Sequence, residues 1–349
     1  MTNRNGMIDF MRFVFCILIV LDHATLFRGR MLAGYIGVEF FFIVSGWLLM
    51  KHIEHKFVLG GVRHNFLKDT LHKVMGFYPE FLIGVIMATF FLQKYGEPVG
   101  IGSCFLGMFN SLMLLQTFGF SVTLGIGVSW YLSVMIGMYL LLSWLAYKFK
   151  QDFINVFIPL IVLFIYGGMS MKYHTVAFVY QSTMDSFILI GMLRGFAGMG
   201  LGMLLYEGSS WLKKVRFTQL GKNVITGIEI FGYVSCICIS IVINRISDWD
   251  FIMIALISMS VMISFSEVSL TSTFFKKKIY YILGRVSLNI FLNHHFIAII
   301  IAVNMLEDSV HTKMMYYFCG IIICTIINYC VANWLRNNLS RFKLLILEK

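Results

Sequence analysis

The sequence predicts an all-α protein that crosses a membrane many times, and three observations indicate this fold class. Of its 349 residues 59% are hydrophobic and 13% are charged, and the mean hydropathy is +0.82, a composition foreign to soluble domains. Proline occurs 3 times and the apolar residues form long runs, which favours helices over the short alternating strands of a β-barrel. The basic residues behind the formal net charge of +11 lie in short patches between these runs, as in loops that face anionic lipid, so we expect no nucleic-acid partner.

Ten apolar runs are long enough to be spans, because a hydrocarbon core of ~30 Å requires about 20 helical residues. An eleventh stretch, residues 104–118, is short, and a full crossing there would move three of the four basic patches to the outside. We therefore predict about ten transmembrane helices plus one re-entrant or outer-face helix. The predicted spans are residues 8–27, 34–50, 74–92, 128–147, 153–170, 187–206, 225–243, 251–268, 280–302 and 314–335.

With this count the basic patches share one side with the N-terminus, and they lie at residues 51–73, 207–224, 276–278 and 336–349. This asymmetry predicts that both termini are cytoplasmic, with a basic cytoplasmic loop at 51–73 and a cytoplasmic tail at 336–349. No linker, repeat or soluble domain interrupts the pattern, so we expect residues 1–349 to form a single integral membrane domain.

The first predicted span contains charged residues that need an explanation, because a charge near the bilayer centre costs at least ~3 kcal/mol. Arg12 and His23 are eleven residues apart, so they point to within about 20° of the same direction and lie roughly 16 Å apart along a helix. One helix face therefore presents a cation near the cytoplasmic end and a titratable base near the outer end. Alternatively, Asp9 only neutralises Arg12 from one turn away.

Three further motifs accompany this pair: "GVEFFFIVSGWLL" at 37–49, "SWYLSVMIGMYLL" at 129–141 and "GRVSLNIFLNHHF" at 284–296. Together they make the chain resemble acyltransferase family 3, in its sugar-acetylase-like branch, since Met135 stands where other members carry Glu. The resemblance implies a ten-helix core that transfers an acyl group, usually acetyl, from cytoplasmic acyl-CoA to a hydroxyl of a surface glycan or its lipid-linked precursor. It also implies that Arg12 and His23 are the central residues and that Thr70 and Lys73 replace a pair of arginines.

Depth along the predicted helices places three titratable groups in one layer near the outer side. Glu39 lies as deep as His23, at ~6 to 8 Å from the outer surface, and His294 reaches the same level on the ninth span. A carboxylate can fix the tautomer of an imidazole that takes the proton of an alcohol. We therefore predict His23 as the catalytic base and Glu39 as its orienting partner, with Asp22 ranked second.

On the inner side Arg12, Lys73 and Arg285 share a level, and we predict that they bind the phosphates of the acyl-CoA. The alternative for Lys73 and Arg285 is ordinary snorkelling to the cytoplasmic surface. Arg12 is also predicted to be catalytic.

Three more residues are predicted to contact the acceptor, together with His294. Arg194 lies too deep in the sixth span to snorkel, so it either contacts substrate or pairs with a carboxylate such as Glu39. Trp130 and Tyr131 form either an interfacial aromatic belt or a platform for a sugar ring. The glycines of "GFAGMGLGM" at 195–203 indicate a helix-packing face.

With the resemblance, which implies acyl transfer, these observations predict a membrane O-acetyltransferase that uses acetyl-CoA and no metal, in the cytoplasmic (inner) membrane of a bacterium. Its partners are membrane lipid and a glycan or lipid-linked sugar, whose hydroxyl His23 deprotonates, directly or by way of an acyl-enzyme. The alternative is a proton-coupled transporter or flippase, since intramembrane Arg, Glu and His also serve as relay residues.

Overall fold

The computed structural model describes residues 4–29, 32–58, 65–96, 98–120, 127–177, 183–184, 188–243 and 247–347. These residues are almost entirely helical, which confirms the predicted all-α class. The exception within the described ranges is a short antiparallel pair of strands, β1 (Thr183–Met184) and β2 (Ile188–Leu189). The helices are α1 (Gly6–His23), α2 (Thr25–Arg28), α3 (Ile36–Val58), α4 (Phe66–Met75), α5 (Tyr78–Tyr95), α6 (Ile101–Leu112), η1 (Gln116–Phe118), η2 (Gly127–Ser129), α7 (Trp130–Asp152), η3 (Phe153–Phe157), α8 (Ile158–Tyr173), α9 (Ile190–Lys214), α10 (Gln219–Val242), α11 (Trp249–Ser266), α12 (Thr271–Phe274), α13 (Lys278–Asn304) and α14 (Val310–Leu347).

Eight of the described helices are long and apolar enough to cross a membrane, and the pair α4 and α5, bent by 57°, makes a ninth if counted as one span. The predicted span at 187–206 accounts for the difference from ten. It forms the 25-residue helix α9, whose many glycines and buried Arg194 lower its apolarity. The multi-pass membrane bundle is thus confirmed, and α9 lies inside it.

Glycines hold α9 against α3, as the sequence indicated. A Cβ atom on Gly202 would lie 2.0 Å from the carbonyl oxygen of Ile43, and one on Gly46 would lie 1.9 Å from that of Met199. Any larger residue would force the two backbones apart. This close approach brings Glu39 of α3 to Arg194 of α9.

Residues 104–118 do not cross the bundle, because α6 has only 12 residues and the chain then turns back through η1 towards α7. Gln116 and Thr117 in this turn are buried, and the Gln116 side chain donates to the Ser129 hydroxyl at 2.8 Å. This burial favours the re-entrant alternative over a helix lying on the outer face.

Two predicted basic segments are more helical than expected. The predicted loop at 51–73 contains the end of α3 and most of α4, which the Asn65 side chain caps by accepting from the Lys68 N–H at 3.0 Å; residues 59–64 lie outside the described residues. The predicted tail continues α14 to Leu347, and residues 348–349 lie outside the described residues.

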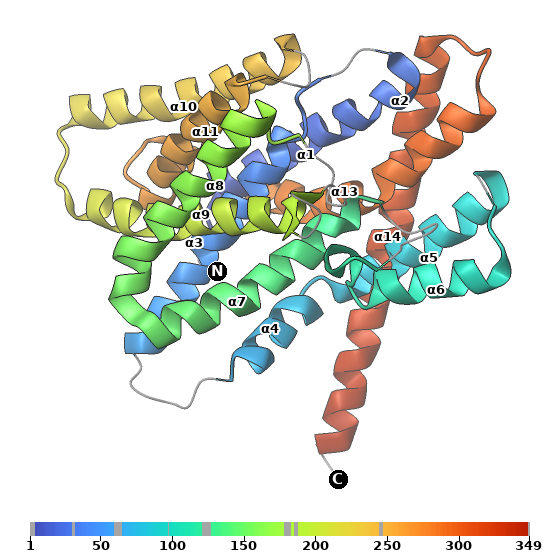
Figure 1. Cartoon of the computed structure of the whole chain (residues 1–349), viewed down its shortest axis with the longest axis horizontal. Helices are drawn as coiled ribbons and strands as arrows, with labels where there is room; N and C mark the ends of the chain where they lie inside the picture. The colour runs from blue at the N-terminus through green and yellow to red at the C-terminus, as the bar shows by residue number, and fades with distance from the viewer. Residues whose placement is uncertain are drawn as a thin grey trace.

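We call the two ends of the bundle the Arg12 end and the His23 end, after two residues of α1. Figure 1 shows α2, which follows the His23 end, near the top, and α4 and the C-terminal part of α14 near the bottom, at the Arg12 end. Inside the bundle α1 packs along α13, and α3 packs along α9. The titratable residues of these four helices therefore lie near one another inside the bundle.

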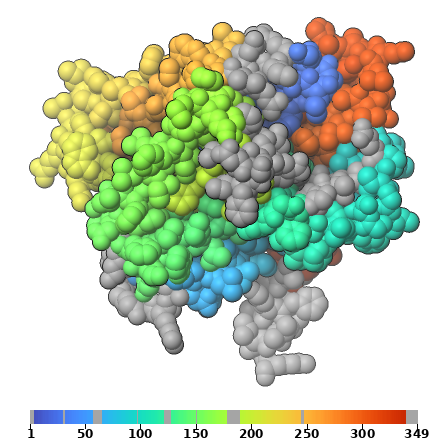
Figure 2. Space-filling model, viewed as in Figure 1, coloured from blue at the N-terminus to red at the C-terminus, as the bar shows by residue number. Residues whose placement is uncertain are grey.

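Many large apolar side chains are exposed on the surface of the bundle. In Figure 2 the green helices α7 and α8 cover much of the visible face, and Leu163 and Phe164 of α8 are 69% and 77% exposed. Side chains of this kind are stable in contact with lipid rather than water.

Candidate active site

Two of the cavities that the described residues line lie one towards each end of α1. The Arg12 cavity has a volume of about 570 Å³ and is lined by five cationic side chains, Arg4, Arg12, Lys73, Arg285 and Arg336. The His23 cavity has a volume of about 340 Å³, and its lining includes His23, Trp130, Arg194 and His295. Tyr131 and Phe291 line both cavities, so the two spaces meet at a common wall.

Arg12 is held at the mouth of its cavity by Asp9, which it contacts at 3.3 Å. Asp9 also accepts two hydrogen bonds from Arg4, at 2.7 and 2.9 Å, so this buried carboxylate is held between two arginines. The Arg12 side chain remains 26% exposed. Asp9 therefore does contact Arg12, as one alternative predicted. Because this single carboxylate is shared by two arginines, the site keeps a net positive charge.

Two more arginines of the Arg12 cavity are fixed by α5 and α14. Arg336 donates to both carboxylate oxygens of Glu80, and to the carbonyl oxygen of Gly76 at 2.8 Å. Arg285 donates to the Asn333 side-chain oxygen at 2.9 Å and lies over the ring of Tyr329. The bidentate contact with Glu80 and the stacking on Tyr329 hold these two guanidinium groups in fixed positions.

His23 at the other end is oriented by a second histidine. The Nδ1 of His294 lies 2.8 Å from the carbonyl oxygen of Phe291, and a carbonyl only accepts, so this Nδ1 carries the proton. The Nε2 of a neutral His294 is then an acceptor, 3.3 Å from the Nδ1 of His23. That His23 nitrogen also lies 2.9 Å from the carbonyl oxygen of Ile19. The Nδ1 of His23 therefore carries its proton, and its Nε2 is the basic nitrogen.

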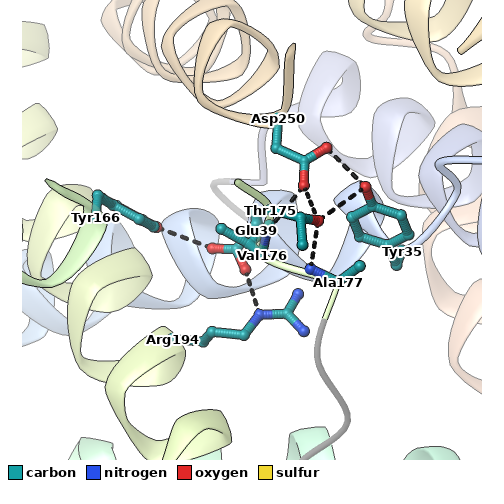
Figure 3. A network of polar contacts seen from close by, with 8 residues as sticks. All are labelled: Tyr35, Glu39, Tyr166, Thr175, Val176, Ala177, Arg194 and Asp250. Atoms are coloured by element: carbon teal, nitrogen blue, oxygen red, sulfur yellow. Dashed lines mark hydrogen bonds and ion pairs between the residues drawn. The ribbon is translucent and has the colours of Figure 1, made fainter. Parts of the chain in front are cut away.

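Glu39 does not occupy the predicted position against this nitrogen. Its two carboxylate oxygens accept from Arg194 Nε at 2.8 Å and from the Tyr166 hydroxyl at 2.9 Å (Figure 3). Arg194 is 1% exposed, and its guanidinium lies 5.4 Å from the centre of the Trp130 ring. The carboxylate thus neutralises a buried cation in the cavity wall, which was one of the two alternatives for Arg194.

A second buried carboxylate holds another part of this wall (Figure 3). Asp250 accepts from the Tyr35 hydroxyl at 2.7 Å, from the Thr175 hydroxyl at 2.6 Å and from the Val176 N–H at 2.9 Å. Tyr35 and Ala177 line the His23 cavity. The network fixes the segment after α8 against α11 and so shapes the opening of the cavity.

The structure gathers most of the predicted residues into these two groups, but Glu39 and His294 are fully buried and line neither cavity, so His294 does not lie at the predicted acceptor-contacting position. Arg12, Lys73 and Arg285 line one cavity, while His23, Trp130, Tyr131 and Arg194 line the other. Tyr131 is 7% exposed, so an interfacial belt does not describe it. Among the described residues no group of three or more His, Cys, Asp or Glu side chains could hold a metal ion.

Sequence reasoning missed Arg4, Arg336 and His295. Arg336 was counted only with the basic tail and Arg4 was not considered, although each contacts a buried carboxylate. The ring of His295 lies 5.0 Å from that of His23, and the only signal for it was the doubled histidine of "NHHF".

The family model described as an acyltransferase domain, that of acyltransferase family 3, matches residues 5–333. Comparison with curated proteins and with solved structures gives no match. The matched segment includes every residue that lines the two cavities except Arg4 and Arg336. This chain, a multi-pass membrane protein by its helices, therefore belongs to acyltransferase family 3 and is a membrane acyltransferase.

Proposed function

We propose that this protein transfers acetyl from cytoplasmic acetyl-CoA to a hydroxyl of a sugar on the other side of a bacterial cytoplasmic membrane. The observation that carries the proposal is the pair of cavities: one is cationic, the other holds an oriented histidine, and the two share a wall. Donor and acceptor can thus enter from opposite ends of the bundle and meet inside it.

The Arg12 cavity is the donor site. Coenzyme A carries several phosphate charges, and the five cations around this cavity outnumber the one carboxylate, Glu80, in its lining. Guanidinium groups bind phosphate oxygens in a bidentate manner, whereas Lys73 acts as a point charge. The basic end faces the cytoplasm, in line with the positive-inside rule, and both termini then lie on the side that supplies acetyl-CoA.

The His23 cavity is the acceptor site. Trp130 and Arg194 both line it, with the Arg194 guanidinium 5.4 Å from the centre of the Trp130 ring, so the lining offers a sugar an aromatic side chain and a polar group, and Glu39 holds Arg194 in place. The acceptor is a hydroxyl of an extracytoplasmic or lipid-linked polysaccharide unit.

His23 is the general base of the transfer. Its Nε2 takes the proton of the sugar hydroxyl, the hydroxyl oxygen attacks the thioester carbonyl carbon, and the carbon–sulfur bond breaks. The sulfur of coenzyme A leaves and receives that proton, so the products are the O-acetyl sugar and the free thiol. His294 keeps the Nδ1 proton of His23 in place throughout, and this lets a neutral imidazole act as the base.

The test uses labelled acetyl-CoA with the protein in lipid vesicles and a crude bacterial glycan as acceptor. We expect wild-type protein to label the glycan and His23→Gln to lose about 10² to 10⁴ of the rate, the usual contribution of a general base. His72→Gln is the matched control, because the Nδ1 of His72 also lies near a carbonyl four residues earlier, at 3.2 Å, but its side chain is exposed.

Failure of the wild-type protein to consume acetyl-CoA with any glycan contradicts the proposal. Movement of a sugar or of protons across the vesicle membrane without acetyl-CoA consumption would favour a proton-coupled transporter instead.

A further inference from the structure

The wall between the two cavities is made of aromatic rings. Of the described residues that line the cavities, only Tyr131 and Phe291 line both. Their ring centres are 5.9 Å apart at an interplanar angle of 78°, and Phe41 completes the cluster at 6.0 Å from Tyr131 and 6.4 Å from Phe291. The three rings come from α7, α13 and α3, so three separate helices close this passage.

The two shared residues are held differently. The Tyr131 hydroxyl lies 3.2 Å from the Ser45 hydroxyl, on the side of the Arg12 cavity. The Phe291 ring is held by packing alone, and an edge-to-face contact contributes only about 0.5 to 1.5 kcal/mol. Of the two shared residues, Phe291 is therefore the one whose ring can rotate at the lower cost.

The aromatic wall lies next to the histidine that orients the proposed base. Phe291 provides the carbonyl oxygen that orients His294, and its ring lies 5.9 Å from the His294 ring. A thioester from the Arg12 cavity must pass the aromatic rings before its carbonyl carbon can meet a hydroxyl beside His23. Water from the His23 side must pass the same rings to reach the thioester.

We propose that Phe41, Tyr131 and Phe291 form an aromatic gate that admits a short acyl thioester, excludes longer chains and limits hydrolysis of the donor. This inference rests on the proposed acyl transfer and adds the residues that set acyl-chain length. The chemical class it selects is the two-carbon acyl group, because a gap left by one rotated ring accommodates few carbon atoms.

The experiment measures transfer from acetyl-, butyryl- and octanoyl-CoA to the same glycan, together with hydrolysis of acetyl-CoA without acceptor. We expect wild-type protein to prefer acetyl, and Phe291→Ala to reduce its preference over butyryl by about tenfold or more, since each methylene in a fitted pocket is worth that much. Hydrolysis without acceptor should rise in the same variant. Phe291→Leu fills more of the space and gives an intermediate result if Phe291→Ala folds poorly.

One control isolates the ring of Phe291. Phe296→Ala removes a ring of equal size from the same helix, where Phe296 is 1% exposed and stacks on Phe91 away from both cavities, so the chain-length preference should stay. If Phe291→Ala and Phe291→Leu transfer acetyl with unchanged preference and unchanged hydrolysis, the gate is refuted while the acyltransferase stands. If wild-type protein transfers no acyl group, the proposed function fails first.

Discussion

The Arg12 cavity and the His23 cavity hold their polar groups in different ways. Around the Arg12 cavity the cations are partly exposed, with side-chain exposures of 38% for Arg4, 26% for Arg12 and 29% for Arg336. Around the His23 cavity Glu39, Arg194 and His294 are buried, and short contacts from neighbouring helices fix them. The first arrangement suits capture of an anion over a range of geometries, and the second suits one fixed position of a base.

This difference predicts that the Arg12 cavity tolerates single substitutions better than the His23 cavity does. Several cations share the work of binding, so the loss of one weakens binding without abolishing it. A general base works only within hydrogen-bond reach, and a misplacement of about 1 Å can cost a factor of about 10².

Glu39→Gln should have the largest effect, and it should act on the stability of the fold. The substitution leaves Arg194 as a buried cation beside a neutral amide, which costs about 3 to 5 kcal/mol when one partner of a buried pair is removed. Thermal unfolding in detergent measures the loss, and Glu39→Gln with Arg194→Met should recover part of it. The control is Lys213→Gln, because the Lys213 and Glu267 side chains are 62% and 51% exposed and such a pair contributes about 1 kcal/mol at most. Equal unfolding temperatures for Glu39→Gln and Lys213→Gln would contradict this prediction, because they would show that the buried pair stabilises the fold no more than the exposed pair.

His294→Ala should lower kcat by about 10² and leave KM for acetyl-CoA unchanged, because His294 positions the base and does not line the donor cavity. His294→Gln should restore part of the rate, since its amide oxygen can accept from the Nδ1 of His23. A parallel rise of KM, or no recovery with Gln, would show that His294 acts through packing only.

Sequence reasoning found the helices and the depth of the site, because both follow from apolar run length and from the rise per residue. It placed His23, Glu39 and His294 in one layer, and the structure brings two of them, His23 and His294, to 3.3 Å from each other. It could not assign neighbours within that layer. Glu39 has the predicted depth, but direction around the bundle depends on how α3 and α9 pack, and their glycines bring Glu39 to Arg194.

The Arg12 cavity shows the same limit, because sequence reasoning did not identify all of its lining residues. Arg336 follows the last predicted span and was counted with the basic tail, although α14 continues without interruption and brings it to Glu80 on α5. Charge at a helix end predicts the side of the membrane. Only contact between distant helices shows that such a charge lines a cavity.

Arg12→Gln should raise KM for acetyl-CoA by about tenfold to a hundredfold, the value of one hydrogen bond to a charged group, and should preserve the fold. Asp9 keeps both hydrogen bonds from Arg4 in this variant, so no buried carboxylate loses its last partner. Isothermal titration with coenzyme A measures the binding loss, and Lys213→Gln again serves as the control. Unchanged affinity would mean that the donor phosphates bind elsewhere.

Ionic strength should have the smallest effect, and it should act on one cavity only. Raising salt from about 0.1 M to 1 M shortens the screening length from about 10 Å to about 3 Å, so the partly exposed cations of the Arg12 cavity attract coenzyme A less strongly. KM for acetyl-CoA should therefore rise severalfold, while kcat stays constant because screening affects the buried contacts around His23 much less. The ratio of the two parameters across a salt series separates the cavities without any substitution. A fall in kcat at constant KM would reverse the assignment of the exposed cations to binding and of the buried contacts to catalysis.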